Sequence, residues 1–160
     1  MDNGARIRII CGNIDGKQGP VRDIIIDPEY LDITVPARSE YTHPTKRGHT
    51  VFAYVIEGKG YFCKEKEPFS YEMEGINYFD MKRDPFLNNG DLVLFDDGNQ
   101  VMASTEGDPV RFLLISGKPI GEPIAWYGPI VMNTRDELRI AFEEYNNGTF
   151  IKQQKVKIMN

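Results

Sequence analysis

Hydrophobic and polar positions alternate in short segments through most of the chain. Such alternation, broken by turn residues, predicts half-buried β-strands. In one segment Leu31, Ile33 and Val35 fall on one face, whereas Asp32 and Thr34 fall on the other. Because the segments are closely spaced and precede any helical pattern, they indicate an all-β sandwich or barrel. The strands predicted in this way span residues 6–11, 21–26, 31–35, 50–56, 61–64, 92–95 and 110–116.

Glycines and acidic residues interrupt this pattern in the middle of the chain. The triplet Gly58-Lys59-Gly60 follows a strongly hydrophobic segment, and glycine accepts the positive φ of a tight turn, so a hairpin into residues 61–64 is predicted. Residues 64–89 mix acidic and aromatic side chains, which indicates an excursion from the strands whose aromatics pack it down. A lid or a partner surface is the alternative for a loop of this length.

One amphipathic helix is marked near the C-terminus. Thr134 and Glu137 have the spacing of a capping box, in which the two side chains bind the free amides of a helix start. Gly148 suits the position after the helix end. Residues 150–160 interleave lysines with apolar residues, which predicts a packed segment with a solvated face. The apolar face of the helix consists of Leu138, Ala141, Phe142 and Tyr145.

Composition narrows the class of protein. The chain has 160 residues, a mass of 18.3 kDa and 41% hydrophobic residues, enough for a core in one domain. Its net charge of −5 argues against nucleic acid, because phosphate binding needs clustered cations. No apolar run approaches a membrane-spanning length, and the N-terminus carries no secretion-signal pattern. Cys11 and Cys63 lack a paired spacing, so reduced thiols and a cytoplasmic location are expected.

The residues best suited to chemistry lie between Tyr41 and Gly60. His43 and His49 precede a hydrophobic strand that ends in Glu57 and two glycines. A histidine-bearing loop entering such a strand resembles the first motif of the cupin superfamily, whose members are small double-stranded β-helix barrels. The resemblance implies a metal in many members, held by three His and one Glu, and such ligands suit Fe, Mn, Ni or Zn.

Alignment with the cupin motifs leaves too few metal ligands in this chain. The first histidine position falls on His43, but His49 lies one place from the glutamate position, which in a strand reverses the side-chain face. We therefore expect no metal and no other cofactor. Fe or another first-row divalent metal, bound by both histidines and Glu57, is the alternative. The other three ligand positions fall on or near residues that do not normally bind such metals: Thr45, Thr50 and Val101.

The C-terminal third sharpens this resemblance to one family. Residues 117–123 read Gly-Lys-Pro-Ile-Gly-Glu-Pro, and residues 128–134 read Gly-Pro-Ile-Val-Met-Asn-Thr before the predicted helix. This order closely resembles the second half of the pirin family. The turn at 17–21 and the loop at 43–49 fit the same half, so the resemblance covers nearly the whole chain.

The pirin resemblance implies a definite fold. The expected class is all-β, a single cupin barrel of the double-stranded β-helix or jelly-roll type, with a C-terminal amphipathic α-helix. One domain is expected over residues 1–160. The barrel would occupy about residues 5–117, and the connection, helix and tail about residues 118–160.

The resemblance is less informative about activity. Pirins have two barrels, and their single metal site lies in the first, which has no counterpart in this chain. Some members are quercetin dioxygenases, and a eukaryotic member is an iron-dependent transcriptional co-regulator. We expect a metal-free binding or assembly module without redox chemistry of its own. A dioxygenase of the quercetinase type and a co-regulator acting through protein contacts are the alternatives.

No catalytic residue is assigned, but two sets of candidates follow. His43, His49, Tyr41 and Tyr54 are candidates to line a pocket for a small apolar or aromatic ligand, or to transfer protons near neutral pH. The favoured interpretation gives these histidines a structural role and not a chemical one. The histidines would be loop residues that fix the strand entry, because no carboxylate at a telling spacing orients either ring.

The second set is the apolar face of the helix. In a chain without a second barrel, this face would be free to bind another copy in a homodimer, or a separate cupin chain. The interface candidates are Leu138, Ala141, Phe142 and Tyr145.

Overall fold

The computed structural model describes residues 4–64 and 85–152, which fall into two compact units. The first unit covers residues 1–119 and the second residues 120–160. Each unit is described by itself. No helix within the described residues is long and apolar enough to cross a membrane.

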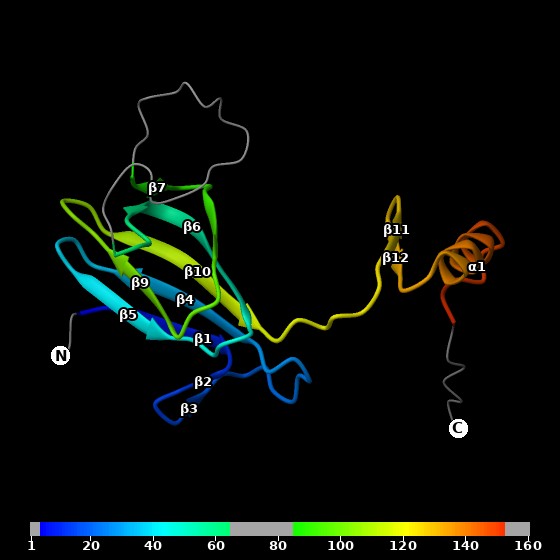
Figure 1. The fold of residues 1–160 in the computed structure, drawn as a ribbon, viewed down its shortest axis with the longest axis horizontal. Coiled ribbons are helices and arrows are strands. Elements are labelled where there is room, and N and C mark those ends of the chain that lie inside the picture. Colours follow the sequence, from blue (N-terminus) through cyan, green and yellow to red (C-terminus); the bar gives the residue numbers. More distant parts are fainter. Residues whose placement is uncertain (1–3, 65–84, 153–160) are drawn as a thin grey trace, which may run out of the picture. The chain divides into compact units, whose positions relative to one another are not determined.

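The first unit is built on one antiparallel sheet (Figure 1). Its strands run in the order β1-β4-β10-β6-β7, and β8 also pairs with β6. The central strand β10 is therefore hydrogen-bonded on both sides, to β4 and to β6. The strands of this main sheet are β1 (Arg6–Cys11), β4 (Glu29–Val35), β6 (Thr50–Gly60), β7 (Leu87–Asn88), β8 (Leu92–Phe95) and β10 (Val110–Gly117).

Two further strand pairs complete the unit. Strands β5 (Glu40–Pro44) and β9 (Gln100–Ser104) form an antiparallel pair. Strands β2 (Asn13–Ile14) and β3 (Lys17–Gln18) form a short hairpin. Buried side chains of β9 join those of the main sheet in one core, so the β5–β9 pair closes the barrel over the sheet.

Alternating burial explains why these segments form strands with one inner face. Along β10, Val110, Phe112 and Leu114 are buried, and the residues between them are partly exposed. The rings of Phe62 and Phe112 meet edge-to-face with 4.9 Å between centroids, a favourable aromatic geometry. The predicted strands 6–11, 31–35, 50–56, 92–95 and 110–116 are confirmed.

The predicted strand at 21–26 is wrong. Only Val21 makes a bridge, to Cys11, and the segment then turns. Asp23 and Asp27 have φ values of 60° and 48°, which interrupt an extended backbone. Ile25 is 98% exposed, so the hydrophobic run does not mark a buried strand.

The predicted hairpin at Gly58-Lys59-Gly60 is also wrong, because β6 continues to Gly60. Arg111 pairs with Glu57 and Phe112 with Val55, which leaves Ile56 as the extra residue of a β-bulge. Gly58 follows the bulge with a φ of 74°, and a Cβ there would lie 2.0 Å from the carbonyl oxygen of Pro109. The glycine therefore permits a close approach of two strands rather than a turn.

Several other elements differ from those predicted from the sequence. Residues 61–64 are not a strand, although Tyr61 makes a single bridge to Ser104. Strands β5 and β9 were missed, so His43 lies in a strand and not in a loop. Most of the predicted excursion at 64–89 and most of the tail at 150–160 lie outside the described residues.

The second unit is a hairpin with one helix. Strands β11 (Ala125–Tyr127) and β12 (Ile130–Met132) pair antiparallel and precede α1 (Arg135–Asn146). The predicted capping box is confirmed, because the Thr134 hydroxyl accepts from the Glu137 amide and the Glu137 carboxylate accepts from the Thr134 amide. The prediction of an all-β chain with one C-terminal helix is confirmed for the described residues.

We predict that Gly58→Ala destabilises the protein by more than about 2 kcal/mol, because the new Cβ forces β6 away from Pro109 in addition to straining φ. Urea unfolding measures the loss. Gly48→Ala is the matched control: Gly48 has a φ of 77° but nothing within 4 Å of the added Cβ, so only the φ strain of about 1 kcal/mol remains. Equal losses in the two variants would contradict the close approach.

Candidate functional site

A buried polar cluster joins the two sides of the barrel. His43 on β5 is 3% exposed, and its Nδ1 lies 3.0 Å from the hydroxyl of Tyr41, two residues earlier on the same strand. Its Nε2 lies 3.0 Å from Oε2 of Glu29, the first residue of β4. Both ring nitrogens of His43 are therefore engaged, and the cluster links the β5–β9 pair to the main sheet.

The partners assign the direction of these hydrogen bonds. A carboxylate oxygen accepts, so the contact between Oε2 of Glu29 and the ring assigns the donor role to the His43 Nε2–H. In the tautomer that carries its proton on Nε2, Nδ1 accepts from the Tyr41 hydroxyl. Burial, with the charges of Glu29 and Asp15, raises the pKa of Tyr41 to about 12, which keeps the phenol protonated as a donor. The cluster is a chain of hydrogen bonds from phenol to imidazole to carboxylate, an arrangement able to relay a proton.

The cluster corrects one interpretation of the sequence. Tyr41 and His43 were both candidates, and the structure brings them together. The expectation that no carboxylate orients a histidine is wrong for His43, because Glu29 does so from a strand 14 residues earlier. The sequence did contain a signal for this contact. Glu29 lies two residues before Leu31 and four before Ile33, and this spacing places it with them on the inner face of β4.

The other two pocket candidates lie elsewhere. His49 is in the turn before β6, where its amide donates to the Lys46 carbonyl at 3.2 Å. Its buried Nδ1 has no hydrogen-bond partner in the described part of the chain. Tyr54 is exposed on the outer face of β6, opposite to the inward Val55. These two side chains do not join the cluster around His43.

A metal ion, which the cupin resemblance implies, does not fit these residues. Both ring nitrogens of His43 are bonded, and Glu57 faces a groove on the outer surface of the sheet. No group of three or more His, Cys, Asp or Glu side chains that could hold a metal occurs within residues 4–64 and 85–152. A first-row metal site needs at least three such ligands.

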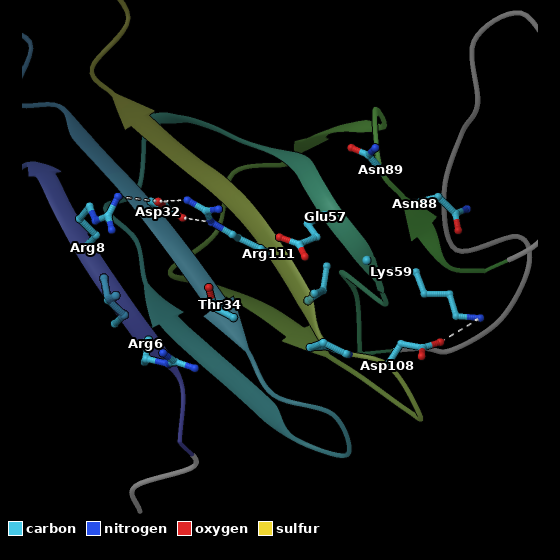
Figure 2. Close-up of a pocket in the computed structure, with 14 residues that line it drawn as sticks. Arg6, Arg8, Asp32, Thr34, Glu57, Lys59, Asn88, Asn89, Asp108 and Arg111 are labelled. Atoms are coloured by element: carbon cyan, nitrogen blue, oxygen red, sulfur yellow. Dashed lines mark hydrogen bonds and ion pairs between the residues drawn. The ribbon is translucent and has the colours of Figure 1, made fainter.

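The second notable feature is a groove of about 1090 Å³ on the outer face of the main sheet (Figure 2). The strand register sets Arg6 of β1, Thr34 of β4, Arg111 of β10 and Glu57 of β6 in one cross-strand row. These side chains share a face because paired residues of antiparallel strands point the same way. The groove thus presents a row of polar side chains.

An ion-pair network organises the groove. The Arg111 guanidinium donates from Nε and Nη2 to the two carboxylate oxygens of Asp32 at 2.8 and 2.7 Å. Arg8 approaches the same carboxylate at 3.7 Å. Hydrogen bonding and the charge of Arg111 hold the pKa of Asp32 below its usual range, against the effect of burial. Arg6, in the same groove, makes no ion pair with any described residue.

Apolar side chains continue this outer face beyond the charged network. The register places Leu113, Tyr54 and Leu92 in one row and Ile115, Phe52 and Leu94 in the next. Leu92 is 59% exposed and Leu94 66% exposed. We call the six residues the apolar strip. Contiguous exposed apolar surface of this kind marks interaction sites.

The second unit also exposes apolar side chains. Of the four interface candidates, Ala141 is buried, Leu138 and Phe142 are half-buried, and Tyr145 is exposed. The Phe142 ring meets that of Tyr127 at 5.4 Å, so part of the expected interface packs within the unit itself. The exposed apolar surface of the unit comprises Ile120, Ile124, Trp126, Tyr127, Val131, Ile140, Tyr145, Phe150 and Ile151.

Comparison with solved structures supports the β-barrel fold, and the family model matched below describes a cupin domain. A crystal structure of quercetin 2,3-dioxygenase from Acinetobacter baumannii superposes with a TM-score of 0.71 at 24% identity, covering 94% of this chain and 45% of that one. A second crystal structure of that name from the same organism gives a TM-score of 0.68 at 17% identity. The predicted cupin fold is confirmed.

The sequence then places the chain within that class. The model of the Pirin C-terminal cupin domain matches residues 30–151, and the chain belongs to this family. A pirin-like protein of Caulobacter vibrioides is 31% identical, with 93% of this chain and 47% of that protein aligned. A Thermoplasma acidophilum protein with the provisional name of a quercetin 2,3-dioxygenase is also 31% identical, over 96% of this chain and 54% of its own length. The chain spans about half the length of the curated relatives it matches.

We predict that Tyr41→Phe destabilises the protein by about 1–3 kcal/mol, because it leaves the buried Nδ1 of His43 without its donor. Urea unfolding at neutral pH measures the change. Tyr54→Phe removes the same atom from an exposed tyrosine and is expected to stay within about 0.5 kcal/mol of the wild type. A loss no larger than that control would contradict the hydrogen bond.

The raised pKa of Tyr41 predicts a specific alkaline behaviour. The folded protein holds this proton to about pH 12, whereas an ordinary tyrosine has a pKa of 10.0. The stability contributed by the protonated phenol is therefore fully present below pH 10 and is lost as the pH rises towards 12. Unfolding measurements should show the wild type losing stability more steeply in this range than Tyr41→Phe. Parallel pH profiles would contradict the burial of the phenol.

Proposed function

We propose that this chain is a binding and assembly module of the pirin family that acts by associating with a second copy of itself. The observation that carries this proposal is the exposed apolar surface of the second unit. A homodimer would cover that surface, and no redox chemistry inside the barrel is required.

The second unit buries too little of its own apolar surface to account for its order alone. Up to residue 152, where the described part of the unit ends, the buried hydrophobic residues are Ile130 and Ala141, whereas Trp126, Tyr127 and Ile124 are each at least 70% exposed. The unit spans residues 120–160, which is close to the length of about 40 residues below which folding usually needs further support. Covering a large apolar side chain contributes about 1.5–3 kcal/mol, so contact with another chain would stabilise the unit strongly.

Symmetry supports a second copy as the partner. A two-fold homodimer would cover the same surface on both copies at once, which is the commonest way in which soluble proteins associate.

A metal-dependent dioxygenase is the second candidate, favoured by the names of relatives such as the Thermoplasma protein. The described residues argue for a different role of the barrel, because His43 is bonded through both nitrogens to Tyr41 and Glu29. A dioxygenase would therefore take its metal ligands from outside the described residues. The barrel described here would then contribute binding surface to such an enzyme.

We predict that the purified chain is a dimer of twice 18.3 kDa by size-exclusion chromatography with light scattering. Ile140→Ser and Val131→Ser, both at exposed positions of the second unit, should shift the equilibrium towards monomer by removing buried apolar contact. Ile25→Ser is the matched control, since it makes the same kind of change at an exposed residue of the first unit. A monomeric wild type at several hundred micromolar would overturn the proposal.

A further inference from the structure

The geometry points to a ligand site on the outer face of the main sheet: we infer that the groove binds a small phosphorylated polyol, such as a sugar phosphate. The phosphate would lie at the arginine end of the groove and the hydroxyl groups at the end formed by β6 and β7. All the residues that line the groove belong to the first unit. The inference goes beyond the proposed homodimer and does not depend on it, because the surface proposed for dimerisation belongs to the second unit.

The arginine end of the groove carries donors suited to a phosphate (Figure 2). The register places Arg6 of β1 and Arg111 of β10 on either side of Thr34 of β4, and neighbouring strands lie about 4.8 Å apart. Arg6 makes no ion pair within the described residues. Guanidinium groups bind phosphate through paired N–H donors, and the Thr34 hydroxyl between them can donate to the same anion.

Asp32 fixes the Arg111 side chain but leaves donors free for a ligand. Nε and Nη2 of Arg111 donate to the two carboxylate oxygens at 2.8 and 2.7 Å, and the Nη1 N–H groups have no partner in the part of the chain that the structure describes. A guanidinium held in this way loses little further freedom when it binds an anion. Asp32 also faces Arg8, so three arginines against one carboxylate leave this end of the groove positively charged.

The other end of the groove suits hydroxyl groups. A polyol hydroxyl both donates and accepts hydrogen bonds, and it can therefore pair with a carboxylate, an amide or an ammonium group. The volume of about 1090 Å³ is at the upper end of the range for small-molecule sites, so one ligand can reach both ends. The residues that line this end are Glu57, Lys59, Asn88, Asn89 and Asp108.

The charges at this second end disfavour a ligand amine. Glu57 pairs in register with Arg111, and Lys59 follows it two residues later on β6. These cations repel a ligand ammonium, whereas an uncharged hydroxyl can donate to the Glu57 carboxylate without adding a positive charge. The mixture of charges in the groove therefore favours a ligand with one anionic end and one uncharged polar end over an amino acid.

Isothermal titration calorimetry with three probes tests the site: ribose 5-phosphate, inorganic phosphate and ribose. We expect ribose 5-phosphate to bind about tenfold more tightly than inorganic phosphate, and ribose to bind more weakly than either. Arg6→Gln should weaken both anions about tenfold. Glu57→Ala should weaken ribose 5-phosphate but not inorganic phosphate. Arg47→Gln is the matched control, because it removes an exposed arginine that lies outside the groove and should change neither affinity.

Several outcomes would overturn the inference. Equal affinities for ribose 5-phosphate and inorganic phosphate would mean an adventitious ion only. A wild-type protein that binds no probe would overturn the site outright, and so would equal losses in Arg6→Gln and Arg47→Gln. All three substituted side chains are exposed, so circular dichroism should show unchanged folding and a loss of affinity can be assigned to the removed group.

The Ile140→Ser and Val131→Ser variants separate this site from the proposed homodimer. Neither residue lines the groove, so both variants should bind ribose 5-phosphate as the wild type does. Loss of binding together with loss of the dimer would mean that a second copy completes the site, which would overturn its assignment to the first unit. A monomeric wild type that binds ribose 5-phosphate would overturn the homodimer and support the site.

Discussion

The pairing of β10 between β4 and β6 is the constraint on which the rest of the first unit depends. Because the side chains of paired antiparallel residues share a face, one register assigns every residue of three strands to the core or to the outer surface. It directs Leu114 and Leu31 inward, and Asp32 and Leu113 outward. A shift by one residue would bury Asp32 with Arg111 and expose the core, so the core, the groove and the apolar strip all follow from the same alignment.

The alternation of inward and outward side chains also explains why the barrel interior contains polar groups. Glu29 is on the inner face of β4, where its carboxylate would be costly to bury without a partner. His43 satisfies it from the opposite strand pair, and Tyr41 satisfies the remaining ring nitrogen. The polar groups of Glu29, His43 and Tyr41 are therefore matched among themselves. An interior arranged in this way holds the two sides of the barrel together and leaves the exterior as the surface that faces other molecules.

Local sequence patterns predict an element correctly where its tertiary contacts favour the same structure as its own sequence. The alternation in 31–35 and 110–116 and the capping box at Thr134 each predict a structure that forms as expected. Gly58 shows the limit, since a glycine in a turn and a glycine under a neighbouring strand look the same in sequence. The link between Glu29 and His43 joins strands that are not paired with each other, so its partners could be known only from the tertiary arrangement.

The arginines of β1 do more than line the groove on the outer face of the sheet. Strand β1 is the last strand at one side of the main sheet, and an edge of this kind can recruit strands from other molecules and seed amyloid-like stacking. Arg6 and Arg8 place two positive charges on six residues that are otherwise rich in isoleucine. Like charges on an incoming copy of the same strand would repel, so this edge is protected against aggregation by the residues that also line the groove.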